Sequence, residues 1–360
     1  MVFGFGKNGH LSAARTRGRT RGCPWAVLIY IMLWTLTGCG SGGQEGNEQG
    51  RRSQTRATNE QAPRHKPQFS GDSAYAYVQK QVAFGPRVPN TEAHRQCGDY
   101  LIRSLRRFTD STNVQAGTVT AYDGTRLAMR NIMGFINPEV RPRIILCAHW
   151  DTRPFADFDE NKSRQREPIL GANDGASGVG VLLELARQMK KNPPPVGVQF
   201  IFFDAEDYGR PAFEGNFSGQ NNTYCLGSQY WARKLPPGDY IADWGILLDM
   251  VGSPEAQFYQ EGFSREYAPW LVNRVWKTAT HLGYSGYFIF EQTGYVTDDH
   301  RYMNQIANIP TIDIIDYTPK RPRGFGAYWH THDDDMDVVV PETLEAVGRT
   351  VEAVVYQTES

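Results

Sequence analysis

The chain has 360 residues, of which 38 are Lys or Arg and 39 are Asp or Glu, and its formal net charge is −1. With 40% hydrophobic and 21% charged residues it has an ordinary globular composition, which excludes a wholly disordered, fibrous or polytopic membrane chain. Residues 1–38 contain five basic residues and no acid, so the rest of the chain has a charge of −6. We expect no binding to nucleic acid, because a mildly acidic protein lacks the positive charge that phosphate backbones require.

The N-terminus has the pattern of a secretory signal. Four arginines between positions 15 and 21 precede the apolar run 25–36, which is shorter than the roughly 20 residues that a bilayer-spanning helix needs. The sequence Leu36-Thr37-Gly38-Cys39 follows and resembles a bacterial lipoprotein lipobox. We therefore expect residues 1–38 to be a cleaved signal peptide and Cys39 to carry lipid that anchors the protein to a membrane of the cell envelope, on its periplasmic or outer face. The alternative is a signal-anchor helix with an incidental cysteine.

The next segment lacks the residues that build a core. Residues 40–67 contain no aromatic residue and no aliphatic residue larger than Ala, so they cannot bury enough apolar surface to offset the cost of ordering. This predicts a lipidated Cys39 and flexible tether over 39–67, and one folded domain over 68–360. The domain contains Cys97, Cys147 and Cys225, so at most one internal disulfide can form, and Cys147 lies in an apolar strand as a buried thiol is expected to do.

Within the folded domain, short apolar runs alternate with helical stretches. Two helices are expected near 71–84 and 91–107, and Asn131–Ile136 is a candidate edge strand. Four further strands are predicted at 143–148, 198–203, 244–251 and 311–315, with helices at 175–190, 227–234, 264–282, 299–306 and 341–356. Continuous β-branched runs spaced by helices indicate a sheet that is buried on both faces, so we predict an α/β fold, a single α/β/α sandwich domain with a mainly parallel central sheet.

Polar residues stand at the carboxyl ends of these strands, where the chemistry of an open α/β sheet collects. They are His149, Asp151, Asp174, Asp204, Glu206, Asp207, Asp249 and, before the last helix, His330. Any one of the carboxylates could be a helix cap or a turn residue. Together, two histidines and several carboxylates suit a divalent metal with N and O ligands, above all Zn²⁺. A free carboxylate beside a metal ligand, as in Glu206-Asp207, would supply the proton transfer that metal-assisted chemistry at a carbonyl needs.

These motifs resemble those of a known family. His149-x-Asp151, Asn173-Asp174-Gly175, Glu206-Asp207, Leu248-Asp249-Met250 and His330-Thr331 occur in an order similar to that in the zinc aminopeptidase superfamily, which includes the glutaminyl cyclases. The resemblance runs from about Phe84 to the C-terminal helix. Phe84-Gly85-Pro86-Arg87, Asp298-Asp299-His300 and Tyr328-Trp329-His330 make the chain most similar to bacterial glutaminyl-peptide cyclotransferases of the animal type.

The resemblance implies a zinc-exopeptidase-like fold with one zinc ion per subunit, held by Asp174, Asp207 and His330. It also implies Glu206 as the catalytic proton shuttle, a supporting carboxylate network of Asp249 and Asp298, and Trp329 as a wall of the substrate pocket. The implied reaction converts the N-terminal glutamine of peptides and proteins to pyroglutamate and releases ammonia. The neighbouring carboxylates Asp249 and Asp298 would raise the pKa of Glu206, which would help this double role.

The chain departs from the animal enzymes at two places. Asp207 stands where they carry Glu, and Tyr208-Gly209-Arg210-Pro211 stands where they place an aromatic pocket residue. A shorter Asp207 arm requires a closer approach to the metal. As a hypothesis, Trp150 replaces the missing aromatic residue in the substrate pocket.

Two other functions remain open from the sequence. The first is a dizinc aminopeptidase, whose ligands would be His149, Asp174, Asp207, Asp249 and His330, with His149 and Asp249 serving the second metal. The second is a surface lipoprotein that only binds a metal or a peptide; it predicts missing site residues, and none is missing.

The remaining polar and aromatic residues receive structural interpretations. His332 is expected in a solvated loop, and Asp333-Asp334-Asp335 is expected to form a turn with one orienting carboxylate. Tyr267, Trp270 and Trp276 lie at helical spacing and are expected in the core. The long loop that contains residues 157–160 is expected to rim the pocket.

Overall fold

The computed structural model describes residues 66–215, 222–235 and 242–359. The expected signal peptide, Cys39 and nearly all of the expected tether lie outside these residues. In the part of the chain that is described, no helix combines the length and the apolar character that crossing a membrane would require.

A six-stranded sheet lies at the centre of the domain, in the order β1-β2-β4-β3-β5-β8. The strands are β1 (Ser111–Thr120), β2 (Arg126–Ile136), β3 (Arg143–His149), β4 (Gly197–Phe203), β5 (Trp244–Asp249) and β8 (Thr311–Ile315). β4, β3, β5 and β8 are parallel to one another, whereas β1 and β2 are antiparallel to their neighbours. The predicted mainly parallel sheet is therefore confirmed. β6 (Phe258–Gln260) and β7 (Phe288–Gln292) form a second, two-stranded sheet.

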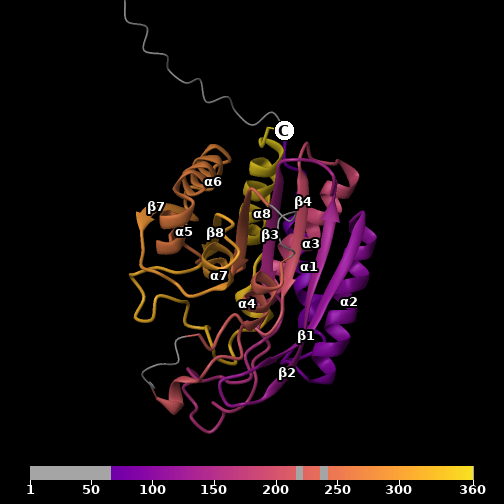
Figure 1. Cartoon of the computed structure of the whole chain (residues 1–360). Coiled ribbons are helices and arrows are strands. Elements are labelled where there is room, and N and C mark those ends of the chain that lie inside the picture. The colour runs from indigo at the N-terminus through magenta and orange to yellow at the C-terminus, as the bar shows by residue number, and fades with distance from the viewer. Residues whose placement is uncertain (1–65, 216–221, 236–241, 360) are drawn as a thin grey trace, which may run out of the picture. The chain divides into compact units, whose positions relative to one another are not determined.

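Helices cover both faces of the central sheet (Figure 1). They are α1 (Gly71–Val82), α2 (Glu92–Phe108), α3 (Ala176–Lys191), α4 (Leu226–Arg233), α5 (Gly262–Tyr267), α6 (Pro269–His281), α7 (Asp299–Gln305) and α8 (Pro341–Tyr356), with 3-10 turns at Ala212–Glu214 and Met336–Val338. One core joins the sheet to α1, α2, α3, α6 and α8, and a smaller one joins its other face to α4 and α7. This arrangement confirms the predicted α/β/α sandwich.

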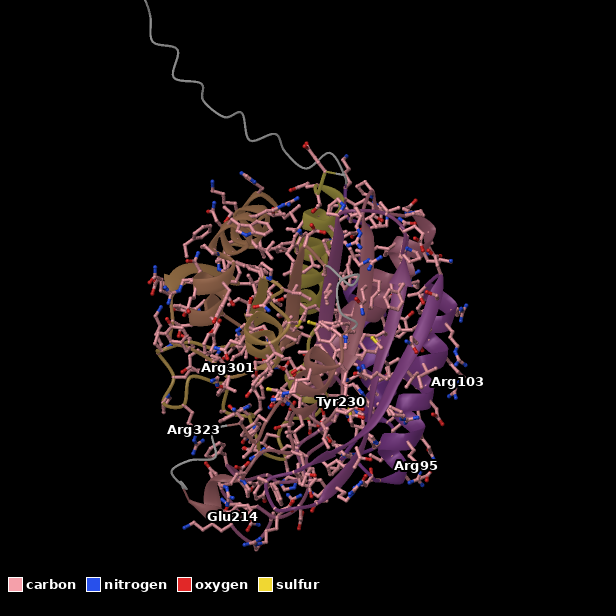
Figure 2. All side chains as sticks on the ribbon, viewed as in Figure 1. Arg95, Arg103, Glu214, Tyr230, Arg301 and Arg323 are labelled. Carbon is pink, nitrogen blue, oxygen red and sulfur yellow. The ribbon has the colours of Figure 1, made fainter. Side chains whose placement is uncertain are left out.

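Alternation along the buried strands explains the two cores. In β3, Ile144 and Leu146 belong to the larger core, while Ile145 and Cys147 face the smaller one. Successive side chains of a strand point to opposite faces, so a strand covered on both sides needs apolar residues throughout. By contrast, α2 is apolar on one side only, and Figure 2 shows Arg95 and Arg103 projecting from it into the solvent.

Several predicted elements need correction. The helix expected at 264–282 is two helices, because Pro269 begins α6 and the backbone leaves the helical region at Ala268. Asn131–Ile136 is part of β2, which is an inner strand, because the unpredicted β1 covers it. β5 stops at Asp249, since Met250 adopts φ +50°.

The sequence predicts that the side chains of Tyr267, Trp270 and Trp276 lie in the core. Trp276 is fully buried as expected, but Tyr267 and Trp270 are exposed, by 36% and 48%. The three cysteines Cys97, Cys147 and Cys225 are free and buried.

Candidate active site

The turn that follows β4 brings two carboxylates into one place. Ala205 adopts φ +53°, a conformation that non-glycine residues rarely use. The two residues after it, Glu206 and Asp207, direct their backbone N–H groups to the buried carboxylate of Asp151, at 2.9 and 3.2 Å. Asp151 therefore holds the backbone of this turn and leaves both side chains free to face the pocket.

A second buried aspartate supports the segment that carries Asp174. Asp334 accepts the backbone N–H groups of Asn173 and Asp174, at 2.7 and 3.1 Å. The expected orienting carboxylate of the 333–335 turn is therefore Asp334. Gly175, the next residue, has φ +100°, and a Cβ there would lie 2.5 Å from the Asp151 carbonyl oxygen, so only glycine fits this start of α3.

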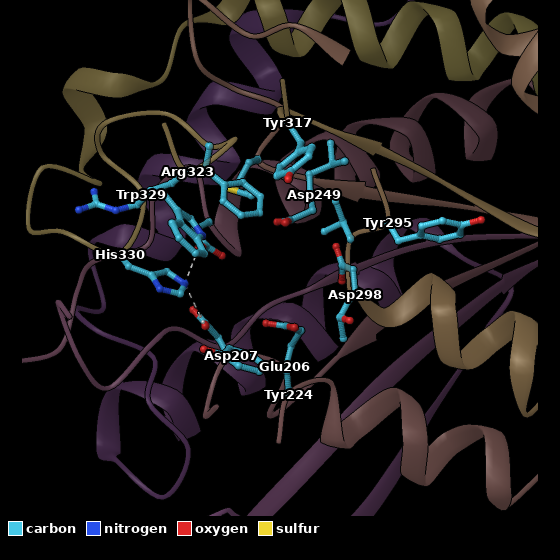
Figure 3. A pocket seen from close by; sticks show the side chains of 16 residues that line it. Glu206, Asp207, Tyr224, Asp249, Tyr295, Asp298, Tyr317, Arg323, Trp329 and His330 are labelled. Carbon is cyan, nitrogen blue, oxygen red and sulfur yellow. Dashed lines mark ion pairs between the residues drawn. The ribbon is translucent and has the colours of Figure 1, made fainter. Parts of the chain in front are cut away.

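Asp174, Asp207 and His330 come together as the sequence predicts. One donor atom from each lies within 4.8 Å of the other two, and all three residues are buried. His330 Nε2 is 3.5 Å from Asp207 Oδ1 and 3.8 Å from Asp174 Oδ2 (Figure 3). The shorter arm of Asp207 therefore reaches the cluster.

The cluster fits a divalent metal. Oδ2 of Asp207 is buried and has no hydrogen-bond partner among the described residues. Burial and the nearby Asp174 raise the pKa of Asp207 well above its ordinary value. A bound cation would relieve this repulsion, and two carboxylates with one imidazole are the N and O ligands that zinc accepts.

The far side of His330 is anchored by an ion pair from the loop expected to rim the pocket. His330 Nδ1 is 3.3 Å from Asp157 Oδ1, and Asp157 pairs through both oxygens with the fully buried Arg153, at 2.7 and 2.9 Å. Burial, followed by the charge of Arg153, lowers the pKa of His330 to about 4. The imidazole is therefore neutral near pH 7, as a metal ligand must be.

His149 joins a second group with Asp174 and Asp249. Its Nε2 lies 3.1 Å from Asp174 Oδ1 and 3.2 Å from Asp249 Oδ1. The ligand atoms of these three buried residues also lie within 4.8 Å of one another. Asp174 belongs to both groups, so the residues of the predicted second-metal alternative are brought together as well.

Glu206, Asp249 and Asp298 line one cavity of about 310 Å³ together with the metal cluster (Figure 3). Burial raises the pKa of Glu206 well above its ordinary value, and Asp207, Asp298 and Asp299 add to the effect although His149 opposes it. Burial raises the pKa of Asp249 to about 7, with a further contribution from Asp298. The pKa of Glu206 is therefore shifted upward, which is the direction expected from the sequence.

Cys225 contacts Glu206, the proposed proton shuttle. The sequence did not predict this contact. Its thiol donates to Glu206 Oε1 at 3.0 Å, and its backbone N–H donates to the Glu206 carbonyl at 2.8 Å. Cys225 has φ +57° and directly precedes α4. No Cys motif pointed to this contact, because it joins two loops 19 residues apart.

The wall of the pocket is aromatic. Trp329 is half-buried between Phe325 and Phe158, with ring centroids 4.1 and 5.0 Å away, and its ring lies 3.8 Å from that of His330. Tyr224, Tyr295, Tyr317, Phe325 and Arg323 line the same cavity. Trp329 therefore lies where the resemblance implies, beside the proposed ligand.

The hypothesis for Trp150 is wrong. Its side chain is fully buried, stacks on His94 at 4.3 Å, and donates its indole N–H to the Arg130 carbonyl at 3.2 Å. Trp150 is not one of the described residues that line the cavity. Alternation explains this: Trp150 follows His149, so its side chain leaves the sheet on the opposite side. His332 is also less solvated than expected, because it bonds Asp159 at 2.6 Å.

The chain is also similar to known proteins. Residues 131–355 match peptidase family M28. The chain belongs to this family. The structure of a glutaminyl cyclase from Tannerella forsythia is 50% identical with a TM-score of 0.79, and the match covers 81% of this chain and 100% of that one.

Two further relatives of this M28 chain carry the names of the two predicted activities. A glutaminyl-peptide cyclotransferase of Drosophila melanogaster is 26% identical over 282 residues, 71% of this chain and 72% of its own. A structure described as a leucine aminopeptidase precursor, from Bacteroides thetaiotaomicron, is 49% identical with a TM-score of 0.78, over 82% of this chain and 99% of that one. The predicted superfamily, fold and enzymatic nature are confirmed, and the chain groups with the bacterial glutaminyl cyclases.

Proposed function

We propose that this M28 enzyme cyclises the N-terminal glutamine of peptides or proteins to pyroglutamate and releases ammonia. The observation that carries the proposal is the 50% identity to a glutaminyl cyclase over the whole length of that chain. The site supports it, because Glu206, Asp249 and Asp298 face an aromatic pocket next to the predicted metal ligands.

In this reaction Glu206 acts as both base and acid. It accepts a proton from the neutral α-amine of the substrate as that nitrogen bonds to the carboxamide carbon of the side chain. It then returns the proton to the departing nitrogen as the carbon–nitrogen bond of the carboxamide breaks, which gives ammonia and a five-membered lactam. Asp298 supports this exchange, because negative charge beside Glu206 favours its protonated form. Asp249 lines the same cavity.

One zinc ion per chain would be held by Asp174, Asp207 and His330. When bound it supplies a Lewis acid that polarises the carboxamide oxygen of the substrate. Trp329 and the aromatic residues around it exclude water from the reacting carbon. That exclusion favours cyclisation, since attack by water would yield glutamate.

The specific alternative is a dizinc aminopeptidase. His149, Asp174 and Asp249 favour it, because they offer a second set of ligands that shares Asp174 with the first. Its products differ from those of the cyclase, so one experiment separates the two functions.

That experiment incubates the purified protein with a short peptide that begins with glutamine, and follows the peptide by mass spectrometry with and without a chelator. Loss of one ammonia from an intact chain, abolished by the chelator and restored by zinc, is the expected result. Release of the first residue would support the aminopeptidase. An unchanged panel of such peptides would overturn both activities and support a binding protein.

We also propose that the protein is attached to a membrane of the cell envelope through lipid on Cys39. The proposal rests on the lipobox-like Leu36-Thr37-Gly38-Cys39 after an apolar run. Labelling cells that express the full chain with an alkyne-tagged fatty acid should label the wild type and not the Cys39→Ser variant. Equal labelling of both would contradict it.

A further inference from the structure

Asp313 stands in the middle of the buried strand β8, where a carboxyl group is unexpected. Its side chain is fully buried, and so are its strand neighbours Ile312 and Ile314. Among the residues that the structure describes, neither of its carboxyl oxygens has a hydrogen-bond partner. A buried carboxylate without a partner is strongly destabilising, so this group needs a proton, a cation or a function that justifies its cost.

The group that Asp313 faces is the pocket carboxyl of Asp298. One oxygen of each and one ring nitrogen of His300 lie within 4.8 Å of one another. Oδ2 of Asp298 and Nδ1 of His300 also have no hydrogen-bond partner in the described part of the chain. Two ionised carboxylates cannot be stable at this separation in a buried site, so a proton must lie between them.

The surroundings decide which of the two carboxyls holds that proton. Burial raises the pKa of Asp298, but Asp298 is the residue before α7 and its Oδ1 accepts the backbone N–H of Asp299, which opposes that rise. Asp313 receives no donor at its carboxyl group. Burial raises the pKa of Asp313 well above its ordinary value, and the charges of Asp298 and Asp249 add to this.

The other charged groups near Asp313 form an ordered background. His300 Nδ1 is 3.6 Å from Asp313 Oδ2, while its Nε2 is 3.0 Å from Glu261 Oε2. Glu261 accepts backbone N–H groups of Phe263, Ser264 and Val296, at 2.8 to 2.9 Å. The further acidic neighbours are Asp249 from β5 and the thiol of Cys147 from β3.

We propose that Asp313 is protonated and donates a hydrogen bond to Asp298, so that it is a positioning residue that keeps the Asp298 carboxylate charged and oriented toward the pocket. His300, held by Glu261, lies beside the Asp313 carboxyl group, with its Nδ1 3.6 Å from Oδ2. This role for Asp298 rests on the proposed cyclase function, whereas the protonation of Asp313 does not depend on it.

The test compares Asp313→Asn with Asp313→Leu. An asparagine amide donates a hydrogen bond as a protonated carboxyl does, whereas leucine has a similar volume and no donor. We expect kcat of Asp313→Asn to stay within about threefold of the wild type, and kcat of Asp313→Leu to fall about tenfold or more. Both variants should keep their zinc, measured by elemental analysis.

Infrared difference spectroscopy of the purified enzyme at pH 8 reports the proton directly. The wild type minus Asp313→Asn spectrum should contain the carbonyl band of a protonated carboxyl group. Glu184→Gln is the matched control, because Glu184 is buried in α3 and pairs with Arg187 at 2.6 Å; its difference spectrum should lack this band.

Three outcomes would overturn the proposal. The first is the absence of the band of a protonated carboxyl group, and the second is an Asp313→Asn variant that is as impaired as Asp313→Leu. The third is the loss of a second metal equivalent in Asp313→Asn, because it would mean that a cation rather than a proton joins the two carboxyl groups. If Asp313→Leu does not fold, the band and the kcat of Asp313→Asn still decide. A wild type without cyclase activity would refute the proposed function and leave the infrared test standing.

Discussion

On the metal side of the pocket the carboxylates that support the proposed ligands have a cation or backbone N–H groups beside them, whereas carboxylates on the opposite side face one another. Asp157 pairs with Arg153, and Asp151 and Asp334 each accept two backbone N–H groups. On the opposite side, Asp298 Oδ2 and both oxygens of Asp313 have no hydrogen-bond partner within residues 66–215, 222–235 and 242–359. The same residue type is thus prepared for a cation on one side and for protons on the other.

The largest effect should come from the metal side. His330→Ala removes one of the three proposed ligands, so we expect loss of zinc and a fall in kcat/KM of at least about a thousandfold. Elemental analysis and the glutamine peptide assay measure both. The control His332→Ala, which removes a histidine bonded to Asp159, should retain zinc and turnover. A His330→Ala enzyme that still binds zinc would remove His330 from the ligand set.

Glu206→Gln should separate the two sides. The variant keeps the proposed ligands and therefore its zinc, but it cannot accept a proton, so kcat should fall by about 10²- to 10⁴-fold. Glu214→Gln, at an exposed residue that pairs with Arg210, is the matched control. Retained turnover in Glu206→Gln would exclude Glu206 from proton transfer.

A smaller effect is expected behind the metal. Asp157→Asn weakens the anchor of His330 and should lower zinc affinity by about 10- to 100-fold. Competition with a chelator measures the affinity, and Asp159→Asn serves as a control in the same loop. An unchanged affinity would show that Arg153 and Asp157 do not orient the ligand.

Replacing the thiol beside Glu206 should have a modest effect. Cys225→Ala removes the donor to Glu206 Oε1, and kcat should fall by about 5- to 10-fold. Cys225→Ser keeps a donor and should lose less. The reverse order of the two variants would mean that packing, rather than the hydrogen bond, explains the contact.

The acidic side should also make the metal-free protein sensitive to pH. The pKa of Asp249 is raised to about 7 in the folded state from 3.8, so its stabilising contribution is complete below pH 4 and is lost as the pH rises through 7. In the presence of a chelator, Tm should fall between pH 4 and 8. The Asp249→Asn variant has no ionisable side chain at position 249, so its Tm should fall by about 5 °C less over this pH range. Parallel curves would contradict the assignment.

Much of the fold could be predicted because buried parallel strands need apolar side chains on both faces. β3, β4 and β8 lie within about one residue of their predicted bounds. β1 escaped prediction because Ser111–Thr120 is polar and half-exposed, and it pairs only with β2. Trp150 was misplaced because a residue type gives no side-chain direction without the strand register.

The sequence by itself determined the four parallel strands and most of the helices around them, and it placed most of the ligand-type residues near strand ends, because these features follow from local apolar patterning. Only the tertiary structure decided which carboxyl group does what. Asp334 reaches Asn173 across 161 positions, and Asp313 faces Asp298 from a different element. Whether an aspartate binds metal, holds a turn or keeps a proton depends on burial and on neighbours that are distant in sequence, since these set its charge.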